Sequence, residues 1–248
     1  MSTLVLALIA GAVVGSALGA LGGGGSVLAV PALIYLLGFT PTAATTASLL
    51  IVTATSATSL YSHATSGNVH WRTGALFAAA GIPPAMAAAA LSAHLPEQLL
   101  TAAFGAVAGL AALRMFKSPA PGDEPRPVRP ARAAGAGAGL GAVTGFLGVG
   151  GGFLAVPALV GVLGLRMRAA VGTSLLVITV NSLAALTVRT GGAAPLDWAV
   201  VAPFTGAAIL AARDGKRLAA AIKGPTLQRI FAVVLLAVAA FMLTDSVR

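Results

Sequence analysis

Charged side chains are scarce in this chain, and their scarcity decides its broad class. Only 8% of the 248 residues are Asp, Glu, Lys or Arg, whereas a soluble domain carries about 25%. Hydrophobic residues make up 58% of the chain, and the mean hydropathy is +0.96. A water-soluble globule of this size would need far more polar side chains to cover its surface. The composition therefore predicts an all-α, polytopic integral membrane protein.

Cysteine is absent, and acidic residues and histidines are few. The lack of cysteine excludes disulfides, thiolate metal sites and cysteine nucleophiles. The three histidines, His63, His70 and His94, are not spaced like the ligands of a metal ion. No nucleophile–base pair stands out either, so we expect neither enzymatic activity nor a cofactor.

The surplus of basic over acidic residues gives a net charge of +9. Such a charge can indicate nucleic-acid binding, but most of these residues lie in a few loops between apolar runs. One loop includes Arg114, Lys117 and Arg129, and the other includes Arg213 and Lys216. Basic loops between apolar segments are typical of cytoplasmic loops that face anionic lipid. We therefore expect the bilayer, and no nucleic acid, as the partner of these charges.

The apolar runs divide the chain into a first membrane repeat (1–116), a proline-rich and charged cytoplasmic linker (117–132) and a second membrane repeat (133–248). Each half contains five runs. The last three of each half are long enough, some only just, for the roughly 20 residues that cross a bilayer. The first two runs of each half are separated by glycines, and the second is too short to span upright. We expect each such pair to be a glycine-broken or re-entrant helix pair.

The glycine-rich phrase occurs twice, as GALGGGGSVLAVPAL from position 19 and as GFLGVGGGFLAVPAL from position 145. An ungapped alignment of 22–56 with 148–182 gives 18 identities in 35 positions, among them matched Gly, Pro and Ser residues. Chance similarity between apolar segments explains matched Leu and Ala, but not matched Gly and Pro in register. The two halves are therefore internal repeats.

The distribution of basic residues predicts that the repeats have opposite orientations. The positive-inside rule places both basic loops in the cytoplasm. Counting membrane crossings from these loops places residues 63–72 on the cytoplasmic side and residues 189–197 on the outer side of the membrane. These two segments match in the alignment of the repeats, so the same element lies on opposite sides in the two copies. Both termini are then outside. Inverted repeats with glycine-interrupted short segments are typical of secondary transporters, whose substrate site lies at the interruptions.

The candidate substrate-binding residues are the two glycine clusters, the polar residues that follow them and two cations. The glycines are Gly22, Gly23, Gly24, Gly25, Gly150, Gly151 and Gly152. The polar residues are Ser48, Thr55, Thr173, Ser174 and Asn181, and the cations are His63 and Arg189, which occupy matching positions. Broken helices would point backbone N–H groups at an anion. Alternatively, the glycines serve helix packing, the hydroxyls bond carbonyls of their own helices, and the cations contact lipid headgroups.

The motifs GGGG-x-x-L-A-V-P-A-L, ATTASLL and HATSGNVHWR in the first half, and GVGGGFLAVPAL with AVGTSLLVI in the second, resemble the TauE/SafE sulfite exporter family over roughly residues 4 to 243. The resemblance implies a bacterial inner-membrane carrier for sulfur-containing anions such as sulfite or organosulfonates.

These observations together favour a secondary transporter for a small anion, which would work by alternating access of the two repeats. An anion channel and a structural or assembly membrane protein without cargo are the alternatives. The oligomeric state stays open, with a dimer as one candidate.

Overall fold

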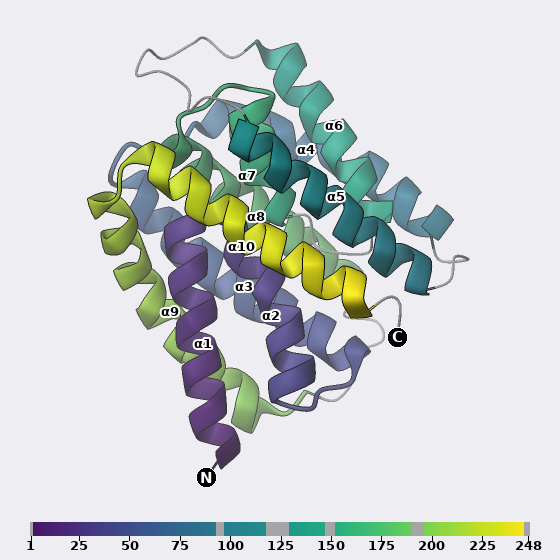
Figure 1. Cartoon of the computed structure of the whole chain (residues 1–248), viewed down its shortest axis with the longest axis vertical. Coiled ribbons are helices and arrows are strands. Elements are labelled where there is room, and N and C mark those ends of the chain that lie inside the picture. The colour runs from purple at the N-terminus through teal and green to yellow at the C-terminus, as the bar shows by residue number, and fades with distance from the viewer. Residues whose placement is uncertain (1, 93–96, 118–128, 147–151, 190–195, 246–248) are drawn as a thin grey trace.

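A computed structural model describes residues 2–92, 97–117, 129–146, 152–189 and 196–245 of the chain, and within these ranges every regular element is a helix (Figure 1). The predicted all-α polytopic fold is confirmed. The first half contains α1 (Ser2–Leu21), α2 (Gly23–Pro31), the π-helical turn η1 (Ala32–Leu36), α3 (Pro41–Ala64), α4 (Trp71–Ser92) and α5 (Glu97–Lys117). The second half contains α6 (Pro130–Phe146), α7 (Gly152–Gly161), α8 (Met167–Arg189), α9 (Trp198–Ala221) and α10 (Gly224–Asp245).

Helix boundaries coincide with residues that favour them chemically. Thr40 caps α3 by accepting a hydrogen bond from the N–H of Ala43, and Pro41 occupies the first helical position. Asp197 caps α9 in the same way through the N–H of Ala199, at 3.0 Å. Pro130 likewise begins α6, so the described ends of the predicted linker, Lys117 and residues 130–132, are helical.

Four helices of the described ranges are long and apolar enough to cross a membrane. They are α1, α3, α8 and α10, with spans at Thr3–Leu21, Ala43–Ala64, Met167–Thr187 and Gly224–Thr244. In the first half, the expected glycine-broken pair is α1 and α2, and the three longer helices α3, α4 and α5 follow it. The first member of that pair is a full-length helix of 20 residues, and only its second member, α2, is short.

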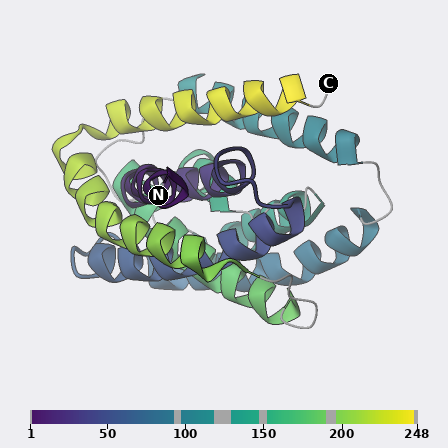
Figure 2. The same cartoon turned by 90° about the horizontal axis from the view of Figure 1, so that it is seen from below.

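In each half, the first helix packs against a helix of the other half. Helix α1 packs along α9 of the second half, and α6, the counterpart of α1, packs along α4 of the first half. Helices α5 and α10 lie side by side along one edge (Figure 2), and α3 crosses α8 in the interior. One buried apolar cluster joins α1 and α3 to α8 and α9, and a second joins α5 and α7 to α8 and α10.

Glycines bring the backbones of the exchanged pairs into direct contact. A Cβ atom on Gly11 or Gly15 of α1 would overlap the carbonyl oxygen of Phe204 or Ala208 in α9. At the matching positions of the second half, Gly137 and Gly141 of α6 meet the carbonyls of Phe77 and Gly81 in α4. The two interfaces are therefore built from equivalent residues. Small residues are what allow membrane helices to approach so closely.

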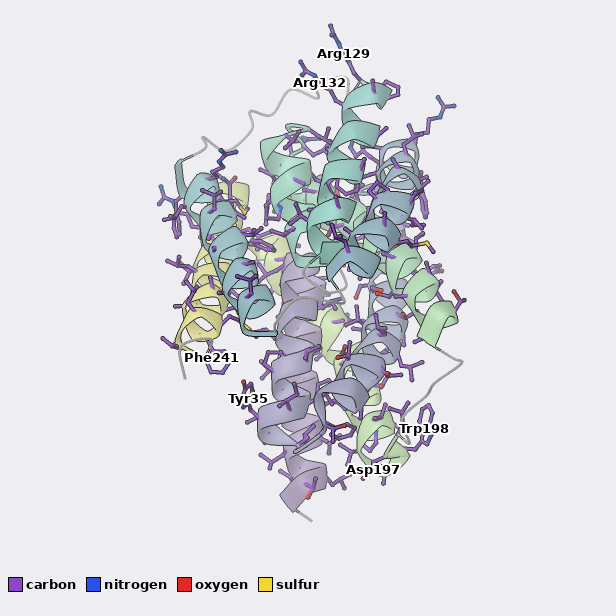
Figure 3. The ribbon with its side chains drawn as sticks, turned by 90° about the vertical axis from the view of Figure 1, so that its right-hand side faces the viewer. Tyr35, Arg129, Arg132, Asp197, Trp198 and Phe241 are labelled. Atoms are coloured by element: carbon purple, nitrogen blue, oxygen red, sulfur yellow. The ribbon has the colours of Figure 1, made fainter. Side chains whose placement is uncertain are left out.

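The two ends of the molecule differ in the residues that they present. Arg129 and Arg132 lie at one end, where α6 begins, and Asp197 and Trp198 lie at the opposite end, toward which α1 has its N-terminus (Figure 3). Helices α1 and α6 therefore run in opposite directions. Trp71 and Trp198 have exposed fractions of 53% and 61%, and tryptophans at the ends of membrane helices are typical interfacial anchors.

Two neighbouring glycine positions of α6 test the role of close packing. We expect Gly137→Ala to lower the stability of the fold by about 1–3 kcal/mol, because the new methyl group has no room against the Phe77 carbonyl. Gly135→Ala is the matched control, since its Cβ would meet no atom within 4 Å and alanine favours a helix. Thermal unfolding in detergent measures both variants. Equal midpoints would contradict the packing role of Gly137.

Candidate functional site

The chain breaks between α1 and α2 at a single residue, Gly22. Its φ is 63° and its ψ is −116°, a conformation that side chains with a Cβ essentially never adopt. Its N–H still donates to the carbonyl of Leu18 at 2.8 Å and so ends α1. The predicted four-glycine break is therefore too long, because Gly23, Gly24 and Gly25 lie within the first turn of α2. One glycine with a positive φ is enough to redirect the chain, and α2 turns back beside α1 (Figure 1).

Gly22 lies directly against the second half of the chain. A Cβ at this position would be 2.5 Å from the Oγ of Ser174 and 3.1 Å from the carbonyl oxygen of Val171, both in α8. The Ser174 side chain is fully buried, and its hydroxyl donates to Val171 at 2.8 Å. The structure thus brings together two of the predicted site residues from different repeats.

The second glycine cluster is described only in part. Gly150 and Gly151 lie outside the described residues, whereas Gly152 is the first residue of α7 and is buried. Helix α7 contacts α2. The two short helices that follow the glycine clusters therefore meet each other inside the protein.

The predicted hydroxyl residues lie on α3 and α8, the two helices that cross in the interior. Ser48 and Thr55 are buried and donate to carbonyls of their own helix, Thr45 at 2.8 Å and Ile51 at 2.7 Å. Thr173 is fully buried and accepts a hydrogen bond from the backbone N–H of His70 at 3.1 Å. These hydrogen bonds give each of the three hydroxyls a partner inside the protein, so none of them is buried without one.

One hydroxyl pair joins the two helices directly. The Oγ1 of Thr179 in α8 lies 2.9 Å from the Oγ of Ser56 in α3, and Ser56 is fully buried. Hydroxyl hydrogens rotate, so this pair can exchange its partners without moving either backbone. Ser56 and Thr179 therefore link the polar residues of the two halves at the α3–α8 crossing, and the hydroxyl residues along these two helices are called the polar strip below.

Three polar atoms near this strip are buried and have no hydrogen-bond partner among the described residues: Ser59 Oγ, His63 Nδ1 and Asn181 Oδ1. His63 has an exposed fraction of 4%, and its Nε2 lies 3.3 Å from the carbonyl oxygen of Gly19. Because a carbonyl only accepts, we assign the ring hydrogen to Nε2, which leaves Nδ1 as an acceptor. Unpartnered buried polar atoms are rare in folded proteins and mark sites of function or bound water.

His63 and Gly22 lie close along α1, since the Gly19 carbonyl that His63 contacts is one helical turn before Gly22. Gly22, Ser174 and His63 therefore gather around the last turn of α1. Arg189, the counterpart of His63, is the last residue of α8, and its side chain lies outside the described part of the chain.

Lys216 makes a specific contact with α3, although the sequence indicates it only as one of the charges of a basic loop. Its Nζ donates to the carbonyl oxygen of Ser62, to Ser62 Oγ at 2.9 Å and to Ser66 Oγ at 2.8 Å. A lysine at this place stabilises the C-terminal end of α3, and partial burial lowers the pKa of its ammonium group. The spacing of Arg213, Lys216 and Arg217, which puts them on one face of a helix, was the available signal.

A basic pocket of about 370 Å³ opens beside Lys216. Arg213, Lys216 and Arg217 of α9 line it from one side, and the hydroxyl residues Thr58, Ser62 and Thr65 of α3 and its C-cap line it from the other. Such a combination of cations and hydroxyl donors attracts small anions.

Comparisons with known proteins identify the relatives of this chain. A family model described as "Sulfite exporter TauE/SafE" matches residues 7–242. A "Probable membrane transporter protein" from Xylella fastidiosa (strain 9a5c) is 33% identical over 254 residues, which cover 99% of this chain and 97% of the relative. A protein of the same description from strain Temecula1 / ATCC 700964 is 32% identical over 255 residues, with the same coverage. No solved structure matches the chain.

The hydrogen bonds of Lys216 give a prediction about stability. We expect Lys216→Met to lower the thermal midpoint by about 5 °C, because charged hydrogen bonds contribute about 2 kcal/mol and each kcal/mol shifts the midpoint of a chain of this size by about 2–4 °C. Arg217→Met is the control, since its ion pair with Asp214 is highly exposed and contributes little. Equal shifts in both variants would show that the contact of Lys216 with α3 is energetically unimportant.

Proposed function

The chain belongs to the TauE/SafE sulfite exporter family and is a membrane transporter, and we propose that its cargo is a small sulfur-containing oxyanion, either sulfite or an organosulfonate. The observation that carries this proposal is the contact of Gly22 with Ser174. There the broken helix of one half meets the polar strip of the other, at the start of α2.

The chemistry of the buried groups supports an anionic cargo. Among the described residues, the buried polar side chains are Ser, Thr, His and Gln, and none is a carboxylate. Hydroxyls and the N–H groups at the start of a helix can donate hydrogen bonds to an oxyanion. A serine that rotates its hydroxyl away from its own helix carbonyl gives up little, because that carbonyl still accepts a backbone N–H.

The basic pocket suits the approach of such a cargo. Arg213 and Arg217 raise the local concentration of anions. Ser62 lines the pocket, and His63, the next residue of α3, contacts α1 near Gly22. We propose that anions move between this pocket and the Gly22 break along α3.

The exchanged helix pairs bear on the mechanism of alternating access. We propose that the two halves are inverted repeats, as their opposite α1 and α6 directions and their equivalent glycine interfaces suggest. Because α1 packs closely along α9, and α6 along α4, the moving bodies are then the pairs α1–α9 and α4–α6. Each pair combines one helix of the first half with one helix of the second. Sliding between these pairs would expose the Gly22 break first to one side of the membrane and then to the other.

We propose that the protein lies in the bacterial inner membrane, with the linker and the basic pocket in the cytoplasm and both termini outside. The absence of native cysteine allows this orientation to be tested in Thr3→Cys and Arg129→Cys variants without other changes. An impermeant maleimide added to spheroplasts should label the Thr3→Cys variant and leave the Arg129→Cys variant unlabelled until the membrane is opened. The reverse result would invert the proposed orientation.

The transport proposal is tested by counterflow in proteoliposomes. Vesicles preloaded with sulfite, sulfoacetate or taurine should accumulate the same labelled compound, and vesicles loaded with sulfate serve for comparison. A channel would dissipate the gradient without counterflow, and a protein that only supports assembly would show no flux. Either of those outcomes would overturn the proposed carrier function.

The same assay tests the Gly22 break. We expect Gly22→Ala to reduce exchange at least tenfold, since a residue with a Cβ in such a sparsely populated backbone conformation costs about 1–3 kcal/mol and its methyl group would strike Ser174. Gly38→Ala is the matched control: its φ is also positive, at 71°, but its Cβ would meet nothing within 4 Å. Normal exchange in Gly22→Ala would remove the break from the transport pathway.

A further inference from the structure

Two apolar grooves of similar size lie on the surface of the protein. The α5 groove, between α5, α6 and α7, has a volume of about 520 Å³. The α10 groove, between α1, α2, η1 and α10, has a volume of about 550 Å³. The lining of the α10 groove is apolar apart from the Tyr35 hydroxyl, and that of the α5 groove is apolar except for Arg114 and Gln228.

The grooves are lined by equivalent positions of the two repeats. Pro31 lines the α10 groove and Pro157 lines the α5 groove, and these prolines match in the alignment of the repeats. Val234 and Val107 also correspond, with the same separation that relates Trp198 to Trp71. The two grooves are therefore two copies of one feature, and their differences are informative.

The copies differ at one end. In the α10 groove the rings of Tyr35 and Phe241 pack edge to face, with centroids 5.4 Å apart and planes at 89° (Figure 3). In the α5 groove the matching positions are Gly161 and Arg114. A Cβ at Gly161 would meet no atom within 4 Å. An aromatic pair therefore fills the end of one groove, whereas the other groove is open there and carries a cation.

The α5 groove has a cationic end and an apolar end. Arg114 is exposed and lies one turn before the end of α5. Val107 lies on the same face, seven residues earlier, or about 10 Å along the helix. Arg129 and Arg132 lie at the start of α6, which also lines the groove. A charged end near the basic loops and a dry interior are complementary to an anionic headgroup with an acyl chain.

We propose that the α5 groove binds an anionic phospholipid, whose acyl chain lies along Val107 and Leu154 and whose phosphate contacts Arg114. A small hydrophilic oxyanion does not fit this description, because most of the groove offers no hydrogen-bond donors. The lipid site is therefore distinct from the proposed pathway at Gly22, and it does not depend on which anion is transported. The α10 groove, with Phe241 in place of Arg114, has no preference for an anionic lipid.

Native mass spectrometry of the purified protein, with phosphatidylglycerol and phosphatidylcholine of the same acyl chains added in competition, tests this site. The unmodified protein should retain phosphatidylglycerol preferentially. Arg114→Gln should reduce that preference about fivefold, the effect expected of one cation beside an anionic lipid surface. Arg132→Gln removes a charge from the same end of the molecule without touching the groove lining, and it should retain most of the preference.

A second pair of variants separates binding in the groove from general attraction to lipid. Gly161→Tyr combined with Arg114→Phe copies the aromatic end of the α10 groove and should abolish selective retention of phosphatidylglycerol. A photoreactive benzoylphenylalanine in place of Gly161 should crosslink to phosphatidylglycerol. Equal loss of preference in Arg114→Gln and Arg132→Gln, or the absence of a lipid crosslink at 161, would overturn the proposed site.

Discussion

The contact of helix backbones across the two halves is the constraint on which the remaining structure depends. In a bilayer the lipid chains are as apolar as leucine, so apolar side chains alone give helices little reason to associate. Gly11, Gly15 and Gly137 remove the side chains at the contact, so that dispersion forces between backbones act at short range. Because these contacts join α1 to α9 and α6 to α4, neither half can bury its own helices without the other.

This interlocking positions the candidate site. Helix α1 is held along α9 over its length, so its last turn and the break at Gly22 come to a fixed place against α8. There Ser174 is buried beside the break, and His63 reaches the same turn from α3. A buried polar atom without a partner costs about 1–3 kcal/mol, yet Ser59, His63 and Asn181 each retain one that has no partner in the described part of the chain. Such a cost persists where the groups serve a ligand that comes and goes.

The repeats share their packing and differ at their surfaces. The glycine contacts and the turns at Gly38 and Gly164, whose φ values are 71° and 67°, occur in both halves. One difference lies at the ends of the grooves, where Tyr35 and Phe241 of one copy correspond to Gly161 and Arg114 of the other. Close packing tolerates few substitutions, whereas groove ends that face lipid tolerate many. The two copies of the repeat can therefore keep the same fold while the ends of their grooves acquire different side chains.

The sequence by itself determined the membrane class, the internal repeat and the family, since scarce charge and matched glycine motifs are local properties of the chain. It also identified Gly22, Ser174 and His63 as candidate residues. The tertiary structure decided that α1 is a full-length helix, that one glycine rather than four makes the break, and that Lys216 contacts α3. These facts depend on which backbones touch. Glycine in a sequence is compatible with a break or with a close contact, and only the position of the neighbouring helix determines which of the two it makes.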